Sequence, residues 1–244
     1  MKFRLLLMLL LCARTTVAQE VSTAVVPVVG SVLGATMIRW KTDVELVNDT
    51  GRPTDVALEL PLAPGLAEFF VTMSPGQTLR FPDIAQAFQL DHVLSPLRVT
   101  TSGRRTVTVR ARVYALRDGE PPSPSQPLTV FVGPSFFPTR VLDNLAFSEE
   151  FRTNIGLVNF GEREAEFVLG LQRIPGRTIA VSRVGVRAGG MSHMSIQSLF
   201  PLITEGSGFN VVVETASRDT YAYASVIESS NHAGRFVAPR VGLR

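Results

Sequence analysis

The stretch "RWKTDVELVN", residues 39–48, has a counterpart in the second half of the chain, "FRTNIGLVN", residues 151–159. An offset of 111 positions places Trp40 on Phe151, Thr42 on Thr153 and Asn48 on Asn159. Side chains in the first copy alternate between apolar or small and charged, a period of two that is typical of a half-buried strand. The inward set is Trp40, Thr42, Val44 and Leu46 in one copy and Phe151, Thr153, Ile155 and Leu157 in the other. We therefore predict an internal duplication of a β-rich unit, with Trp40 and Phe151 as the large aromatic side chains of its two cores.

The similarity extends beyond this strand. The same offset aligns Pro27 with Pro138, and "SPGQTLRFPDIAQAF" (74–88) aligns with "RAGGMSHMSIQSLF" (187–200). Each of these segments reads as a turn, a strand and a short helical turn, whose first N–H groups Asp83 and Ser195 are placed to cap. A β-hairpin follows in each copy, and "VFVGP" (130–134) aligns with "RFVAP" (235–239).

Each copy is about 105 residues with roughly seven short strands, which predicts an all-β protein of two tandem immunoglobulin-like antiparallel β-sandwiches, each with one short helical turn. We place repeat 1 at residues 19–133 and repeat 2 at residues 134–244. The Pro-rich segment 119–127 then becomes a loop inserted before the last strand of repeat 1. Its composition also suits an interdomain linker, and the sequence leaves that alternative open.

Residues 1–18 have the pattern of a secretory signal peptide: a basic start, a short apolar run, and Thr16 and Ala18 before the expected cut. Removing them leaves 21 basic against 21 acidic residues, so the sequence pI of about 9.5 does not support nucleic-acid binding. The only cysteine, Cys12, leaves too, so no disulfide is expected. We expect a secreted protein, periplasmic or extracellular, with no transmembrane segment after signal removal.

The order of "VVP", "RWKTDVELVN", "SPGQTL", the short helix, "LRVTT" and a closing aromatic–Val–x–Pro resembles repeated Ig-like modules of secreted bacterial proteins. The resemblance covers nearly the whole mature chain. The second copy departs from the pattern with Phe151 for the Trp and Asn154 for the Asp. The resemblance implies a cell-envelope or extracellular module without known catalysis, and it transfers no functional residue.

Candidate catalytic and metal-binding residues do not form a recognisable motif. His92, His193 and His232 share no metal-ligand spacing, and Asp143, Glu149 and Glu150 lack the Asp-x-Asp spacing of a Ca²⁺ loop. His193 stands between Ser192 and Ser195, but adjacent strand residues point to opposite faces. "NDT" at 48–50 matches the N-glycan acceptor pattern, and a turn is the simpler interpretation. We therefore predict no catalytic, cofactor-binding or metal-binding residues.

One difference between the copies indicates a candidate interaction face. Arg110 and Arg112 of the last hairpin arm align with Tyr223 and Ser225, and Tyr221 precedes them on the same face. Tyr and Arg are favoured contact residues at interfaces, and spaced aromatic rings also suit stacking on sugars. The alternative is that the arginines pair with Asp43 or Glu45 across strands and that the tyrosines are ordinary strand residues.

Three functions follow from these observations. The first is a non-catalytic secreted or cell-envelope interaction or structural protein with an unidentified protein or glycan partner. The second is a carbohydrate-binding protein that uses the tyrosine face. The third is a pilus-type periplasmic chaperone, which would need basic residues in the cleft between its domains.

Overall fold

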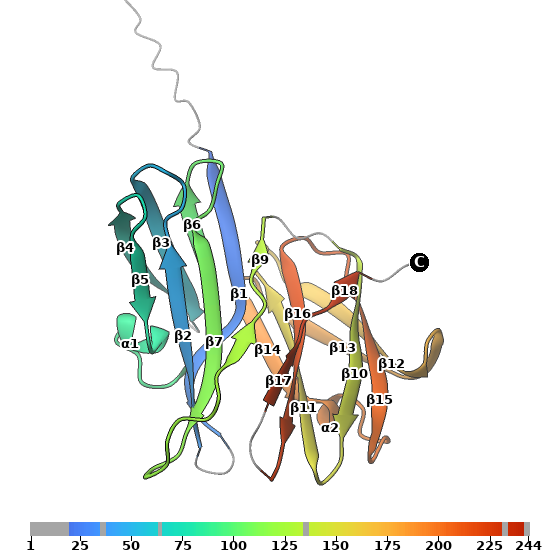
Figure 1. The fold of residues 1–244 in the computed structure, drawn as a ribbon. Coiled ribbons are helices and arrows are strands. Elements are labelled where there is room, and N and C mark those ends of the chain that lie inside the picture. Colours follow the sequence, from blue (N-terminus) through green and yellow to red (C-terminus); the bar gives the residue numbers. More distant parts are fainter. Residues whose placement is uncertain (1–19, 35–37, 63–64, 134–136, 231–233, 242–244) are drawn as a thin grey trace, which may run out of the picture.

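The computed structural model describes residues 20–34, 38–62, 65–133, 137–230 and 234–241, so the predicted signal peptide and Cys12 lie outside the described residues. The chain forms two β-rich halves that lie side by side (Figure 1). The first half contains β1 (Val21–Leu33), β2 (Arg39–Val47), β3 (Thr54–Leu62), β4 (Gly65–Met73), β5 (Thr78–Phe81), α1 (Ile84–Ala87), β6 (Val93–Ser102), β7 (Thr108–Leu116), β8 (Gln126–Leu128) and β9 (Phe131–Val132). The second half contains β10 (Thr139–Phe147), β11 (Phe151–Asn159), β12 (Ala165–Ile174), β13 (Arg177–Val186), β14 (Gly190–Ser195), α2 (Ile196–Leu199), β15 (Gly206–Glu214), β16 (Thr220–Glu228), β17 (Gly234–Val237) and β18 (Arg240–Val241).

The predicted fold class is confirmed: the described chain is almost entirely antiparallel β-structure, with one short helical turn in each half. The second half is a sandwich of a five-stranded sheet, β13-β12-β15-β10-β18, and a four-stranded sheet, β14-β11-β16-β17. The first half repeats both layers as β4-β3-β6-β1-β9 and β5-β2-β7-β8. There β1 pairs with β6 along most of its length and with β2 at its end, so the two layers join into one nine-stranded sheet. None of the described helices is long and apolar enough to cross a membrane.

The strand registers support most of the predicted alignment and correct its two ends. Ala24 pairs with Val99 of β6, and Arg140 pairs with Val213, the residue of β15 that is equivalent to Val99. The first strands of the two halves therefore match at an offset of 116, and Pro27 does not correspond to Pro138. At the other end β8 pairs with β7, and β17 pairs with the equivalent strand β16, so β8 corresponds to β17. Likewise β9 pairs with β1 and β18 with β10, so β9 corresponds to β18. The aligned aromatic–Val motifs at 130–134 and 235–239 are therefore not equivalent strands. A change in loop length allowed the sequence match to slip.

The Pro-rich segment 119–127 runs from the loop after β7 into β8, so it lies inside the first half and does not link the two halves. Thirteen positions separate Val113 from its partner Gln126, whereas nine separate Val226 from Arg235. Among the described residues every strand pair joins two strands of the same half. The predicted boundary between residues 133 and 134 directly follows β9, and residues 134–136 lie outside the described ranges.

The repeated Thr and Asn of the opening stretch have structural roles. Asn48 and Asn159 are fully buried, and each side-chain amide donates to three carbonyl oxygens: those of residues 52, 73 and 74 in the first half and of residues 163, 186 and 187 in the second. Each therefore ties the end of its strand to the two neighbouring loops. Thr42 accepts a hydrogen bond from Gly30 N at 3.0 Å, and Thr153 donates to the Ala146 carbonyl, so both threonines fasten β2 or β11 to the preceding strand. Since Asn48 is enclosed in this way, it is not accessible as a glycan acceptor.

Trp40 and Phe151 are not at the centres of the cores, which corrects the prediction. Both are only half-buried: Phe151 packs on the rim of the second core, and Trp40 lies outside the first. The fully buried side chains on the same faces are Val44 and Leu46 in β2 and Ile155 and Leu157 in β11. A period of two identifies the face to which a side chain points but not how deeply the side chain is buried. Both aromatic residues lie at the start of their strands, at the end of the sandwich.

Candidate functional site at the interface between the two halves

The predicted tyrosine face is buried between the two halves and is not exposed. Tyr221 is 3% and Tyr223 0% exposed. They belong to a third apolar cluster, separate from the two cores, to which the first half contributes Val25 and Phe131 and the second Val158. The sheet β14-β11-β16-β17 is thus covered on both faces, by its own core and by β1 and β9 of the first half. The prediction of an outward-facing surface was wrong because the alternation along β16 continues unchanged when a second layer covers its outer face.

The two halves differ systematically at this face. In the first half Glu45 of β2 stands opposite Arg80 of β5 and Arg110 of β7. The same row in the second half is Gly156, His193 and Tyr223. The Tyr223 ring lies directly over Gly156, where an added Cβ would come within 2.0 Å of two ring carbons. An ion-paired row in one copy is therefore an aromatic row over glycine in the other.

Aromatic contacts hold the halves together. The Tyr221 ring lies 5.2 Å from that of Phe131 in the first half and 6.2 Å from that of Phe160 in its own half. Arg98 of β6 places its guanidinium 5.2 Å from the centre of the Phe160 ring, a cation–π contact between the halves. Tyr223 stacks on Phe236 with ring centres 5.3 Å apart, and Phe236 also packs against the first core. Burial raises the pKa of Tyr221 to about 12 and raises that of Tyr223 too, so both phenols stay neutral.

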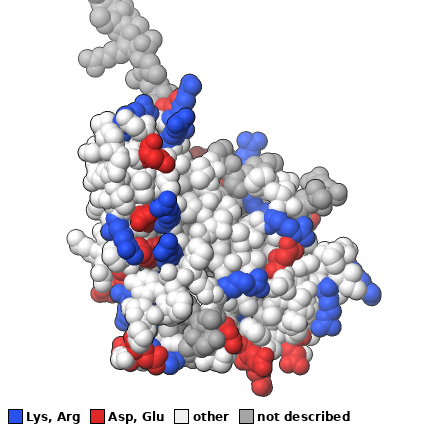
Figure 2. Space-filling model, viewed as in Figure 1, with Lys and Arg blue, Asp and Glu red and all other residues white. Residues whose placement is uncertain are grey.

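Arg110 and Arg112 lie on the exposed outer face of the first half, away from this interface. Arg110 pairs with Glu45 at 2.8 Å, and Asp43 pairs with Arg80 at 2.6 Å. Charged side chains of both signs gather over the face where β2, β5 and β7 run (Figure 2). Arg110 therefore pairs across strands with Glu45, as the alternative interpretation of the sequence proposed. Whether this face contacts a partner stays a prediction.

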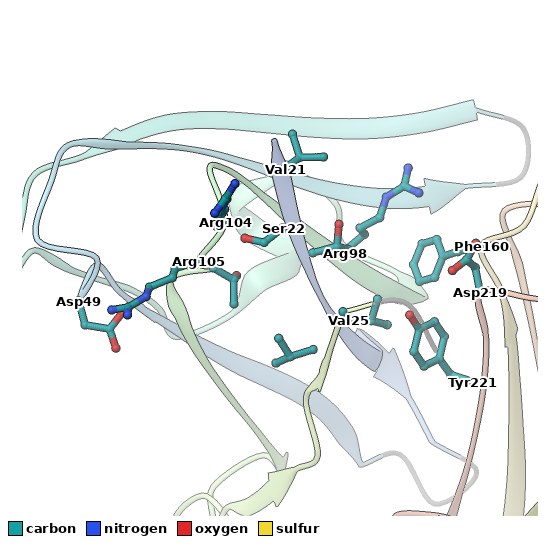
Figure 3. A pocket seen from close by; sticks show the side chains of 14 residues that line it. Val21, Ser22, Val25, Asp49, Arg98, Arg104, Arg105, Phe160, Asp219 and Tyr221 are labelled. Carbon is teal, nitrogen blue, oxygen red and sulfur yellow. The ribbon is translucent and has the colours of Figure 1, made fainter. Parts of the chain in front are cut away.

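At one end of the interface lies a hollow of about 760 Å³, which we call the basic hollow (Figure 3). It is lined by the first residues of β1, by Tyr221 and by three arginines, Arg98, Arg104 and Arg105. Arg98 pairs with Glu59, Arg104 pairs with Glu20, and Asp49 and Asp219 also line the hollow. Its positive charge is therefore largely compensated.

At the other end of the interface is a cavity of about 390 Å³, which we call the interdomain cavity. The end of β1 and the Trp40 side chain form one wall, and β11, β14, β16 and β17 of the second half form the other. The lining is mostly apolar, including Val28, Val32, Leu94 and Phe236. Its volume is within the range of about 300–1,000 Å³ that is usual for small-molecule sites, which also favour domain interfaces.

The polar groups of the interdomain cavity include two arginines, Arg152 and Arg235, together with Asn154 and His193. His193 Nδ1 lies 2.9 Å from the Tyr223 hydroxyl. Burial, and secondly the positive charge of Arg152, lower the pKa of His193 to about 4, so the imidazole is neutral near pH 7. The Nε–H of Arg152 is buried and has no hydrogen-bond partner among the described residues. No described residue that lines the cavity is Asp or Glu.

The other candidate residues do not assemble a reactive site. Ser195 caps α2 by accepting from Ser198 N at 3.1 Å, so His193 bonds to a tyrosine and not to a neighbouring serine. Asp83 likewise caps α1, as predicted. Asp143 pairs with Arg240. Within the described ranges, no group of three or more His, Cys, Asp and Glu residues lies close enough together to hold a metal ion.

Sequence reasoning did not find the cavity, because Trp40, Arg152 and His193 come from three strands and two halves. A signal was nevertheless present in the comparison of the copies. Asp43, Glu45 and Asp83 correspond to the uncharged residues Asn154, Gly156 and Ser195, so the second copy has lost three acids around one strand. Comparison with protein-family models, with curated proteins and with solved structures finds no match for this chain.

Proposed function

We propose that the protein is a non-catalytic secreted or cell-envelope binding protein, whose two β-sandwich modules form one body around a small-molecule site. The interdomain cavity carries this proposal, because an apolar cavity with a few polar groups at a domain interface is the usual form of such a site. The predicted signal peptide supports export. The site offers a neutral imidazole bonded to a phenol and no nucleophile beside a base, which favours binding over catalysis.

A carbohydrate-binding role is the second candidate, and it receives less support. The tyrosines that could have stacked on a sugar are buried in the interface. Trp40 is half-buried and lines the cavity, but the walls around it are mostly aliphatic and supply few partners for sugar hydroxyls. The pilus-type chaperone remains a third candidate. Lys41, which could have supplied a basic cleft, pairs with Asp83 at 2.8 Å, and Arg110 lies on the exposed face of the first half.

The neutral apolar dye N-phenyl-1-naphthylamine tests the binding function in the intact mature protein. Trp40 is the only tryptophan, so its emission reports on the cavity without labelling. We expect saturable binding of one dye per chain, with quenching of Trp40. Ser225→Phe adds a ring inside the cavity and should abolish binding, whereas Ser207→Phe places the same ring at an exposed strand position and should not.

Dye binding that survives Ser225→Phe, or a dye that binds without affecting Trp40 emission, would refute the cavity as the ligand site.

A further inference from the structure

The interdomain cavity also indicates what kind of ligand it holds. Arg152 makes no hydrogen bond or ion pair with the described residues, and its Nε–H is buried. A buried donor without a partner costs about 1–3 kcal/mol, and more when it is charged. A neighbouring carboxylate would normally offset that cost, but the described lining of the cavity contains none.

The equivalent position in the first half shows what Arg152 lacks. Its counterpart is Lys41, which pairs with Asp83 at 2.8 Å. Asp83 corresponds to Ser195, which caps the helical turn as Asp83 does but carries no charge. The second copy has thus kept a cation and lost its acid. The cation now faces a cavity that the first half closes with Trp40 and the end of β1.

The chemistry of the cavity favours an anionic head group. Arg152 makes no ion pair with the described residues, and its planar N–H fork matches the two oxygens of a carboxylate. Arg235 also lines the cavity, but its Nη2 donates to the carbonyl oxygen of Asn144 at 2.6 Å. Neutral His193 adds no further positive charge near pH 7. The rest of the lining is mostly apolar, which matches a ligand with one small anionic group on an apolar body.

We propose that the interdomain cavity binds a small amphiphilic monocarboxylate, with its carboxylate on Arg152 and its apolar body against Trp40, Val32 and Leu94. This inference rests on the proposed binding function and specifies its ligand class. It requires no movement of the tyrosine cluster, because the stacked Tyr223 and Phe236 already form part of the cavity wall.

Decanoate and decan-1-ol, which share a ten-carbon chain and differ in charge, test the inference by calorimetry and Trp40 fluorescence. We expect decanoate to bind at least tenfold more tightly than decan-1-ol at pH 7.5. Arg152→Gln should lower the affinity for decanoate about 10- to 100-fold, as expected for the loss of a charged hydrogen bond. It should leave the affinity for decan-1-ol unchanged. Arg112→Gln, on the exposed face of the first half, is the matched control and should change neither affinity.

Arg152→Gln should not lower the melting temperature of the free protein, because it removes a charge that has no partner. Equal affinity of Arg152→Gln and the wild type for decanoate would overturn the carboxylate assignment. Tight binding of decan-1-ol alone would also overturn it while supporting the proposed function. Failure of both probes and of the naphthylamine dye to bind would sink both proposals.

Discussion

Gly156→Ala is the sharpest test of the interface, because it adds one methyl group below the Tyr223 ring. The new Cβ would lie 2.0 Å from two ring carbons and 2.5 Å from the hydroxyl oxygen, far inside van der Waals contact. The backbone cannot yield easily, since β11 pairs with β14 and β16 on its two sides. The ring must therefore move, which separates its hydroxyl from His193 and disturbs its stacking on Phe236.

The expected cost follows from three contributions. Overpacking a well-packed site costs about 1–3 kcal/mol, and the lost hydrogen bond adds about 0.5–1.5 kcal/mol. Replacing glycine in a strand returns about 0.5–1 kcal/mol. We expect a net loss of about 1–3 kcal/mol, which for a chain of this size lowers the melting temperature by roughly 2–4 °C per kcal/mol. Differential scanning calorimetry and urea titration measure both quantities.

A matched control and a double-mutant cycle make the test specific. Gly170→Ala makes the same change in β12, where the new Cβ meets only Thr178 at 3.4 Å, so it should be neutral or slightly stabilising. In a Tyr223→Ala background the obstacle is gone, and Gly156→Ala should then also be harmless. If Gly156→Ala destabilises equally with and without the tyrosine ring, or is as mild as Gly170→Ala, the description of this interface is refuted.

Three further predictions concern other parts of the chain. Asn159→Ala leaves one buried and two part-buried carbonyl groups short of a donor and should destabilise the second half by about 1–3 kcal/mol, measured by urea titration. Lowering the pH from about 6.5 to about 4 should reduce the free energy of unfolding by on the order of 3 kcal/mol through His193. In this range the imidazole is protonated in the unfolded chain, whereas in the folded chain it takes up the proton only near pH 4. The contribution of His193 is fully present above about pH 6.5. His193→Gln should flatten that part of the stability profile and His92→Gln, at an exposed position, should not. The exported chain should begin directly after Ala18, and an intact mass that includes residues 1–18 would contradict the predicted cleavage.

The sequence by itself determined the duplication, the all-β class, the helical turns with their capping residues, and the faces of the strands. These features are local: alternation, turn residues and capping side chains act over a few positions, so one copy can be compared directly with the other. The repeated Asn also appears in the sequence, although its three carbonyl partners do not, because they come from loops up to 28 residues away.

Only the tertiary structure decided which surface each face meets. Tyr223 and Arg110 occupy the same place in their sheets, yet one is buried against the first half and the other is solvated, because only one of the two sheets is covered by a neighbour. The same holds for Trp40, whose strand and face were predictable but whose place at the rim of a cavity was not. Covering a sheet leaves its period of two unchanged, so alternation alone cannot tell solvent from a second apolar layer. The unpaired charge of Arg152 likewise depends on which elements pack around it, and that arrangement is a property of the assembled halves.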